Sequence, residues 1–310
     1  MPGERATFTW MAGRQGRGSF TFNRLYIYHL PKTGTSTVFS ALRGAAGLLF
    51  HHIRRAHPGF EAPFIGRLDD EGKMTADHIE LNGGVIASHR PFGFHRRFSH
   101  VYHLATVLRD PISRVRSAYT YDAMRHRQPV TSDGFRAHFE AARNRNVMCA
   151  LLSGQVADKA LTNINMEQSI NNVSTAFSLA APSTHIADLC ESYLQWGGLP
   201  NVVIDRINRT EPAYQLDVTP FAEEIATLNQ MDQSLFDAVA AHPRLTPPEP
   251  VEPGEPHGLT LLMRQTVNDI SVRGLARSVP THWIPDDARQ RQFDPDLFAA
   301  LFARGEPVPL

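Results

Sequence analysis

Residues 25–44 read LYIYHLPKTGTSTVFSALRG, a short apolar run followed by a hydroxyl-rich turn and then a helical pattern. The run at residues 25–30 is rich in β-forming side chains, and Pro31 ends it because proline cannot donate to a sheet ladder. Gly34 permits a tight turn before the helix. A buried strand that leads directly into a helix is the unit of parallel sheets, so this stretch predicts an α/β fold.

The rest of the chain repeats this unit. Apolar runs indicate further strands, and the amphipathic runs between them indicate helices. Strands are expected at residues 83–88, 101–108 and 201–204, and helices at residues 35–46, 111–124, 158–176, 185–195, 220–228 and 232–241. Strands that are apolar on both faces need helices on both sides. We therefore predict a three-layer αβα fold with one central parallel sheet.

A proline-rich segment divides the chain. Residues 242–258 contain six prolines, which favour an extended linker. One folded unit is expected at residues 1–241, with an N-terminal arm at residues 1–22, and a C-terminal extension at residues 259–310. The extension has helical patterns at residues 260–269 and 294–302 and is too short to fold alone. We expect it to pack on the body or to form a homodimer with a second subunit.

The composition excludes several classes of protein. Thirty-one lysines and arginines balance thirty-one acidic residues, so no global charge favours nucleic acid as a partner. No run approaches the ~20 apolar residues of a transmembrane segment, and the first residues lack the apolar core of a secretory signal. We therefore expect a cytoplasmic protein. Cys149 and Cys190 are too few for a disulfide scaffold or a four-cysteine zinc site, and are expected to be buried.

The turn at residues 31–37, PKTGTST, is typical of a phosphate-binding site. The first amides of a helix have no intrahelical acceptor, and the helix dipole adds partial positive charge there. The residues expected to bind the anion are Lys32, Thr33, Gly34, Thr35, Ser36 and Thr37. A helix cap without a ligand would use the same residue types. The order also differs from the Walker A pattern, in which the lysine follows the second glycine.

A second candidate site lies at residues 108–119, LRDPISRVRSAY. Asp110 can cap a helix that starts at Pro111. Arg109 precedes this helix and Ser117 lies two turns into it, so both could bind one anion; an arginine fork matches phosphate oxygens. In the alternative interpretation, Arg109 pairs with Asp110 or another acid, and Ser117 bonds only to its own helix.

Together, residues 31–37 and 108–119 resemble the two nucleotide-binding signatures of sulfotransferases that use 3′-phosphoadenosine 5′-phosphosulfate (PAPS). The likeness is greatest to the carbohydrate branch, typified by heparan and uronyl 2-O-sulfotransferases and their bacterial relatives. It implies a P-loop-like fold and a donor that needs no metal. Lys32 and the turn would then bind the phosphosulfate, and Arg109 with Ser117 the 3′-phosphate. Residues 83–93, GGVIASHRPFG, resemble the strand that ends in the family's catalytic base, here His89.

The resemblance implies transfer of a sulfuryl group to a hydroxyl acceptor, with a glycan or a glycan-containing small molecule as the first choice. Lys32 would neutralise charge on the leaving oxygen, and His89 would take the proton of the acceptor. Arg90, Arg96 and Arg97, with His95, form a basic cluster that could bind a carboxylated or sulfated sugar, and Arg90, His95 and Arg96 are the expected contacts. A solvated basic surface is the alternative for this cluster.

Two other functions fit parts of the sequence. A P-loop nucleotide kinase or NTPase that uses MgATP could have the same strand, turn and helix, with Asp205 in NVVID as its magnesium ligand. A binding protein that has lost catalysis could keep the fold. The presence of Lys32, His89, Arg109 and Ser117 together argues against this second alternative.

Overall fold

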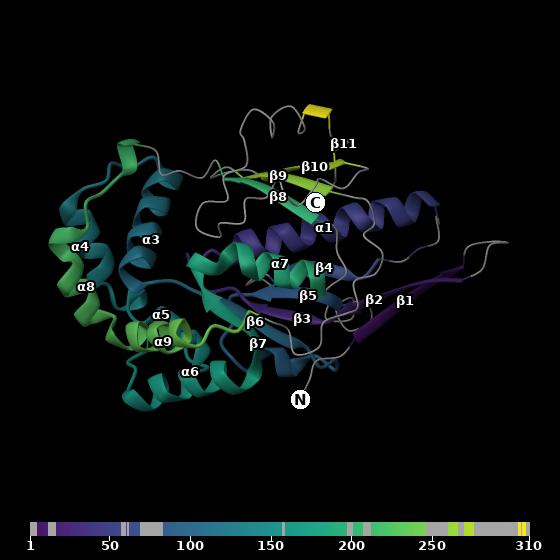
Figure 1. The fold of residues 1–310 in the computed structure, drawn as a ribbon. Helices are drawn as coiled ribbons and strands as arrows, with labels where there is room; N and C mark the ends of the chain where they lie inside the picture. Colours follow the sequence, from purple (N-terminus) through teal and green to yellow (C-terminus); the bar gives the residue numbers. More distant parts are fainter. Residues whose placement is uncertain are drawn as a thin grey trace.

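The structure is a computed structural model that describes residues 5–11, 17–56, 60, 62–68, 83–156, 159–196, 201–206, 212–245, 260–265, 270–275, 303–304 and 306–307. A five-stranded parallel sheet lies at its centre (Figure 1). Its strands, in spatial order, are β4 (Phe64–Leu68), β5 (Gly83–Ser88), β3 (Leu25–Tyr28), β6 (His103–Leu108) and β7 (Phe177–Pro182). The prediction of an α/β fold with a central parallel sheet is confirmed.

The register of the central sheet gathers three strand ends at one edge. Tyr28, the last residue of β3, pairs with Ser88 on β5 and with Thr106 on β6. Because the strands are parallel, the residues that follow β3, β5 and β6 all leave the sheet on the same side. Ligands of open α/β sheets bind at such carboxyl edges, where neighbouring connections diverge.

The two faces of the sheet have separate cores, because side chains alternate along each strand. Leu25 and Ile27 pack with helices α1 (Thr35–Ala56) and α7 (Ile186–Trp196). Tyr26 and Tyr28 point to the opposite core, with helices α5 (Val147–Leu152), α6 (Asn163–Ala176) and α9 (Gln230–Ala241). Helices therefore cover both faces, as a three-layer arrangement requires (Figure 1).

A third group of helices lies beyond one end of the central sheet (Figure 1). It comprises α3 (Pro111–His126), α4 (Ser132–Glu140) and α8 (Ala222–Leu228), around the buried rings of Phe135, Phe139 and Phe221. Helix α3 starts as predicted: Pro111 is its first residue, and the Asp110 carboxylate accepts the amide of Ser113 at 2.8 Å. Short 3₁₀ turns complete the connections: η2 (Phe94–Arg97), η3 (Ala142–Asn144), η4 (Ser183–His185), η5 (Pro212–Tyr214) and η6 (Thr219–Phe221).

A second sheet corrects two sequence predictions. Its strands, in spatial order, are β11 (Glu306–Pro307), β10 (Ile270–Leu275), β9 (Thr260–Gln265) and β8 (Asn201–Arg206). The strand predicted at residues 201–204 forms, but in this sheet and not in the central one. The helix predicted at residues 260–269 is wrong, because residues 260–265 pair with β8 in parallel register and sheet pairing overrides the local pattern. The helix predicted at residues 294–302 lies outside the described residues.

Helix α1 lies between the two sheets, since its other side contacts β8 and β9 (Figure 1). It also runs ten residues beyond its predicted end at residue 46. At the N-terminus, β1 (Arg5–Met11) and β2 (Arg17–Asn23) form an antiparallel hairpin that leads into β3. The sequence analysis does not predict this hairpin or strands β4 and β7.

Other predictions fall on described residues. Helix α6 occupies most of the segment predicted as mainly helical, and both cysteines are buried and form no disulfide. Of the predicted linker, residues 242–245 are described; Arg244 exchanges two backbone hydrogen bonds with Ala180 on β7. Residues 246–258 lie outside the described part. Within the described residues, no helix combines the length and apolarity needed to cross a membrane.

A buried ion pair holds α3 against α9. Arg114 Nε lies 3.7 Å from Asp232 Oδ2, and the two side chains are 2% and 0% exposed. The Asp232 carboxylate also accepts the amides of Met148 and Cys149 at 3.3 and 2.8 Å, and Arg114 Nη2 donates to the carbonyl of Asn144 at 2.7 Å. Because both charges are removed from water, each depends on its partner.

We expect Asp232→Asn to lower the free energy of unfolding by about 3–5 kcal/mol, because it leaves the buried Arg114 charge without its partner. The matched control is Glu224→Gln, which removes the ion pair between Glu224 and Arg136, whose side chains are 38% and 48% exposed. That change should cost less than about 1 kcal/mol. Urea unfolding measures both, and equal losses would contradict the structural role of the buried pair.

Candidate functional site

The turn between β3 and α1 has an unusual backbone. Lys32 has a φ of 63° and Gly34 a φ of 97°, so two left-handed residues flank Thr33. Left-handed lysine is uncommon and persists only where its surroundings enforce it. The Thr33 hydroxyl donates to the carbonyl of Leu30 at 3.0 Å and lies 2.8 Å from the Thr35 hydroxyl, and both threonines are fully buried. These two hydroxyls therefore hold the shape of the turn.

The start of α1 offers backbone amides to an anion. The Thr37 amide donates to the carbonyl of Gly34 at 2.9 Å, whereas the amides of Thr35 and Ser36 belong to the first turn, where no intrahelical acceptor exists. The first turn of this 22-residue helix contains no acidic residue. No side chain of that turn thus neutralises the positive end of the helix dipole.

Helix α7 packs directly against the turn. A Cβ atom at Gly34 would lie 2.4 Å from Cδ1 of Ile186, so a side chain at this position would force Ile186 to move. Ile186 is the first residue of α7 and is buried in the core below α1. His185 directly precedes Ile186, and Asp188 lies two residues after it. His185 Nδ1 lies 3.1 Å from Asp188 Oδ2. The sequence analysis does not predict that Ile186 lies against the turn.

Arg109 and Lys32, one from each sequence motif, are in contact. Arg109 Nη1 donates to the carbonyl of Lys32 at 3.1 Å, and the Lys32 ammonium lies 3.5 Å from the ring centroid of Tyr121 on α3. Burial and the nearby Arg109 charge lower the pKa of Lys32 to about 8, against an opposing effect of the Asp122 carboxylate. Two cationic side chains thus lie side by side at the N-terminal end of α1.

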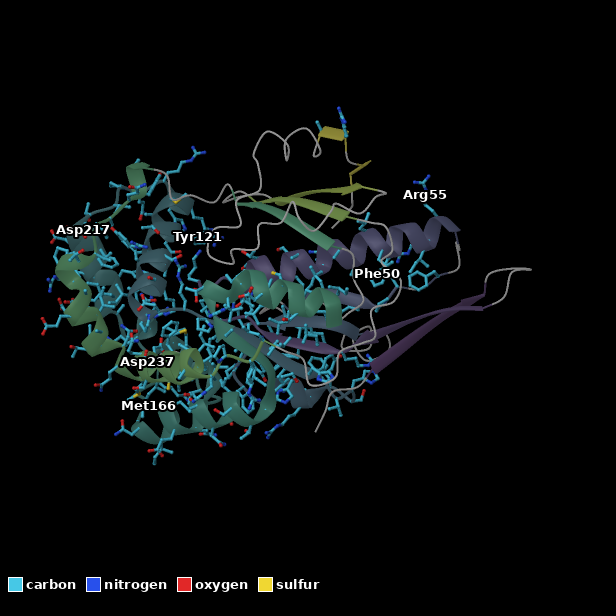
Figure 2. All side chains as sticks on the ribbon, viewed as in Figure 1. Phe50, Arg55, Tyr121, Met166, Asp217 and Asp237 are labelled. Carbon is cyan, nitrogen blue, oxygen red and sulfur yellow. The ribbon has the colours of Figure 1, made fainter. Side chains whose placement is uncertain are left out.

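Ser117 lies on the same side of α3 as Tyr121. Ser113, Ser117 and Tyr121 follow one another at four-residue spacing, which places them along one face of the helix. Since Tyr121 contacts Lys32, this face is turned toward the turn between β3 and α1 (Figure 2). Ser117 is partly buried there. The structure therefore brings Lys32 and Arg109 together at the carboxyl edge of the central sheet, and it places Ser117 on the face of α3 that carries Tyr121.

His89 follows β5 and reaches the turn through a second histidine. Its exposed ring stacks on that of His29, with ring centroids 4.1 Å apart. His29 is only 6% exposed, and its Nε2 lies 2.8 Å from the Ser36 hydroxyl. Burial lowers the pKa of His29 to about 2, with further contributions from the charges of His89, Arg67 and Lys32. His29 is therefore a neutral ring between His89 and the start of α1.

The basic cluster after β5 divides into two parts. Arg96 and Arg97 are exposed, and their guanidinium groups lie 5.8 Å from the ring centroid of Phe92 and 4.9 Å from that of Phe94, respectively. Arg90 also lies over Phe94, at 5.7 Å, and its amide donates to the Ser88 hydroxyl at 2.9 Å. These arginines form a surface beside His89.

His95 does not join that surface. Its Nδ1 lies 2.5 Å from the hydroxyl oxygen of Tyr28, which also accepts the amide of Gly93 at 3.0 Å. Burial and the Arg96 charge lower the pKa of His95 to about 4, so the neutral ring can accept the Tyr28 proton. The structure gives this predicted substrate-binding residue a packing role, because its ring lies among Tyr26, Tyr28 and Phe92.

Comparison of the sequence with models of known protein families found no match, and a search of curated proteins also found none. Among the described residues, no group of three or more histidine, cysteine or acidic side chains is arranged to hold a metal ion. The chemistry of the site follows from its own geometry: two cations, free helix amides and an exposed imidazole at one sheet edge. Such a set can bind a ligand with several anionic groups and can accept a proton beside it.

We expect Gly34→Ala to destabilise the protein more than Gly93→Ala. Both glycines have a φ of 97°, but a Cβ at Gly93 would meet nothing within 4 Å. Both variants bear the backbone cost of about 1–2 kcal/mol, and Gly34→Ala adds at least about 1 kcal/mol for overpacking against Ile186. Adding Ile186→Val, which lacks Cδ1, should recover part of that extra loss in urea unfolding. Equal losses in the two single variants would contradict the tight packing of α7 on the turn.

Proposed function

We propose that this chain is a sulfotransferase that moves a sulfuryl group from PAPS to a hydroxyl group of a carbohydrate acceptor. One observation carries the proposal: Arg109 contacts Lys32 at the N-terminal end of α1. Two cations beside free helix amides favour a ligand with more than one phosphate-like group, which PAPS is. The strand, turn and helix at residues 25–56 would then serve as a P-loop-like donor site, as the sequence resemblance implies.

Different residues of the site would bind the two ends of the donor. The amides of Thr35 and Ser36 would bind the 5′-phosphosulfate, with the Lys32 ammonium beside them. Arg109 and Ser117 would bind the 3′-phosphate from the β6–α3 connection. Thr33 and Gly34 contribute by holding the backbone in the conformation that exposes these amides.

Lys32 and His89 would carry the chemistry. The Lys32 ammonium stabilises the negative charge that develops on the bridging oxygen as its bond to sulfur breaks and the oxygen keeps the electron pair. The acceptor oxygen forms the new bond to sulfur, and His89 takes the proton of that hydroxyl. The stacked His29 stays neutral, so it orients His89 without repelling the imidazolium that forms.

The acceptor would lie on the side of His89. Arg90, Arg96 and Arg97 form a basic surface next to this residue, and phenylalanine rings support their guanidinium groups. Such a surface suits a carboxylated or sulfated sugar, because arginine forks bind these groups in pairs of hydrogen bonds. His95 packs against Phe92, the ring over which the Arg96 guanidinium lies.

The MgATP alternative has less support. Its magnesium ligand would be Asp205, but β8 belongs to the second sheet, on the other side of α1 from the central sheet. Asp205 therefore does not lie on a strand of the sheet that contains β3, where a magnesium ligand beside the turn would be expected. The alternative of a catalytically inactive binding protein predicts donor binding without transfer.

The first experiment is a thermal shift assay with 3′-phosphoadenosine 5′-phosphate (PAP) in the absence of magnesium. At a hundredfold excess over its Kd, PAP should stabilise the native state by about 2.7 kcal/mol. Arg109→Gln should lose most of this effect, whereas Arg116→Gln, an exposed arginine on the same helix, should keep it. Stabilisation by MgATP and none by PAP would contradict the proposal.

Transfer from labelled PAPS to a pool of glycans separates the enzyme from the inactive binding protein. His89→Ala should lower transfer by about 10²–10⁴-fold, because a general base contributes that much, and should keep the stabilisation by PAP. His242→Ala, a change at another exposed histidine, is the control and should leave both unchanged. Transfer that is equally fast in His89→Ala would contradict the role of this residue.

PAP affinity should fall about tenfold between pH 7 and pH 9. The Lys32 ammonium, with its pKa lowered to about 8, is mostly charged at pH 7 and mostly neutral at pH 9. The second ionisation of the phosphates, near pH ~6, is complete in this range, and Arg109 keeps its charge. Calorimetric titration measures the affinity, and Lys32→Met should bind weakly with no such pH dependence. If the PAP affinity of Lys32→Met fell with pH as steeply as that of the wild type, a group other than Lys32 would cause the pH dependence.

A further inference from the structure

Tyr121 lies outside both sequence motifs and yet contacts the central cation of the site. Its ring faces the Lys32 ammonium, with Nζ 3.5 Å from the ring centroid. Figure 2 shows Tyr121 on α3, on the side of the helix turned toward the central sheet. A lysine at this distance over an aromatic face is held by attraction between its charge and the ring quadrupole.

Arg109 before α3 and Tyr121 on α3 thus hold Lys32 at two points. Arg109 binds the carbonyl of Lys32, which has a left-handed backbone, and Tyr121 holds the ammonium at the end of the side chain. The lysine side chain has four rotatable bonds, so the contact to its backbone carbonyl alone would not fix the position of the ammonium. The aromatic contact supplies the second point of attachment.

The type of contact matters for an anion site. Among the described residues, no carboxylate lies within salt-bridge distance of the Lys32 ammonium. A carboxylate would neutralise the charge and compete with an incoming anion. An aromatic ring attracts the cation and leaves its net charge in place. Ordering the lysine before the ligand arrives also avoids the loss of side-chain entropy on binding.

We propose that Tyr121 is a positioning residue that holds the Lys32 ammonium in the anion site, ordered and still charged, before the donor binds. The identity of the anion rests on the proposed function, whereas the contact itself does not. The hydroxyl group of Tyr121 forms no hydrogen bond with the described residues, so the ring alone should suffice. Tyr121→Phe is therefore the conservative variant, and Tyr121→Leu removes the ring.

The first readout is the NMR signal of the lysine ε-methylene groups, which needs no ligand. The chain contains only three lysines, Lys32, Lys73 and Lys159, so the signals are few. The ring current of Tyr121 should shift the Lys32 signal upfield of the other two. Tyr121→Phe should keep this shift and Tyr121→Leu should remove it, while Lys32→Met assigns the signal.

The second readout is the affinity for PAP, measured by calorimetry at pH 7. Tyr121→Leu should weaken binding about threefold to tenfold, which corresponds to the cost of ordering one long side chain, and Tyr121→Phe should bind as the wild type does. Urea unfolding checks that each variant is folded. If Tyr121→Leu does not fold, Tyr121→Met, which keeps volume without the ring, takes its place.

The outcomes separate the two proposals. Failure of the wild type to bind PAP refutes the proposed function alone; the affinity test then uses inorganic pyrophosphate as the anion. Positioning by Tyr121 is overturned if the ring-dependent shift is absent, if the shift is lost without a change in anion affinity, or if affinity falls while the Lys32 signal stays in place. It is also overturned if neither PAP nor pyrophosphate binds the wild type.

Discussion

The hydrogen bond from Arg109 to the carbonyl of Lys32 joins the ends of two neighbouring strands, and the arrangement of the site depends on it. It brings a guanidinium and an ammonium together, although like charges repel. The depressed pKa of Lys32 records part of that cost. A protein tolerates such a pair where the surrounding fold fixes both groups and where a ligand of opposite charge completes the site.

The fold fixes this pair through a chain of contacts that begins far from the sheet edge. Asp232 on α9 holds Arg114 in the interior and thereby sets the position of α3. Helix α3 in turn carries Tyr121 to Lys32. On the other side of β3, the His29 ring links His89 to the first turn of α1. Buried groups therefore hold the candidate site in place on both sides of β3.

The sequence predicted what local chemistry determines. Pro31 ends a strand and Asp110 caps a helix, as the local pattern predicts. That Lys32 and Arg109 belong to one site was implied by the family resemblance, and the two residues are in contact. Pairing between distant segments did not, because residues 260–265 have an apolar run that suits a helix or a strand until β8 is known to lie beside it. His95 and Tyr121 illustrate the same limit, because their partners Tyr28 and Lys32 are more than 60 residues away.

The position of α1 between two sheets has a consequence for synthesis on the ribosome. Every strand of the central sheet precedes residue 183, whereas β9, which helps to cover the far side of α1, begins at residue 260. Because N-terminal parts fold first as the chain emerges, the central sheet can assemble while one side of α1 is still bare. A chaperone could bind the uncovered side of α1 in such an intermediate until β9 has been synthesised and covers it.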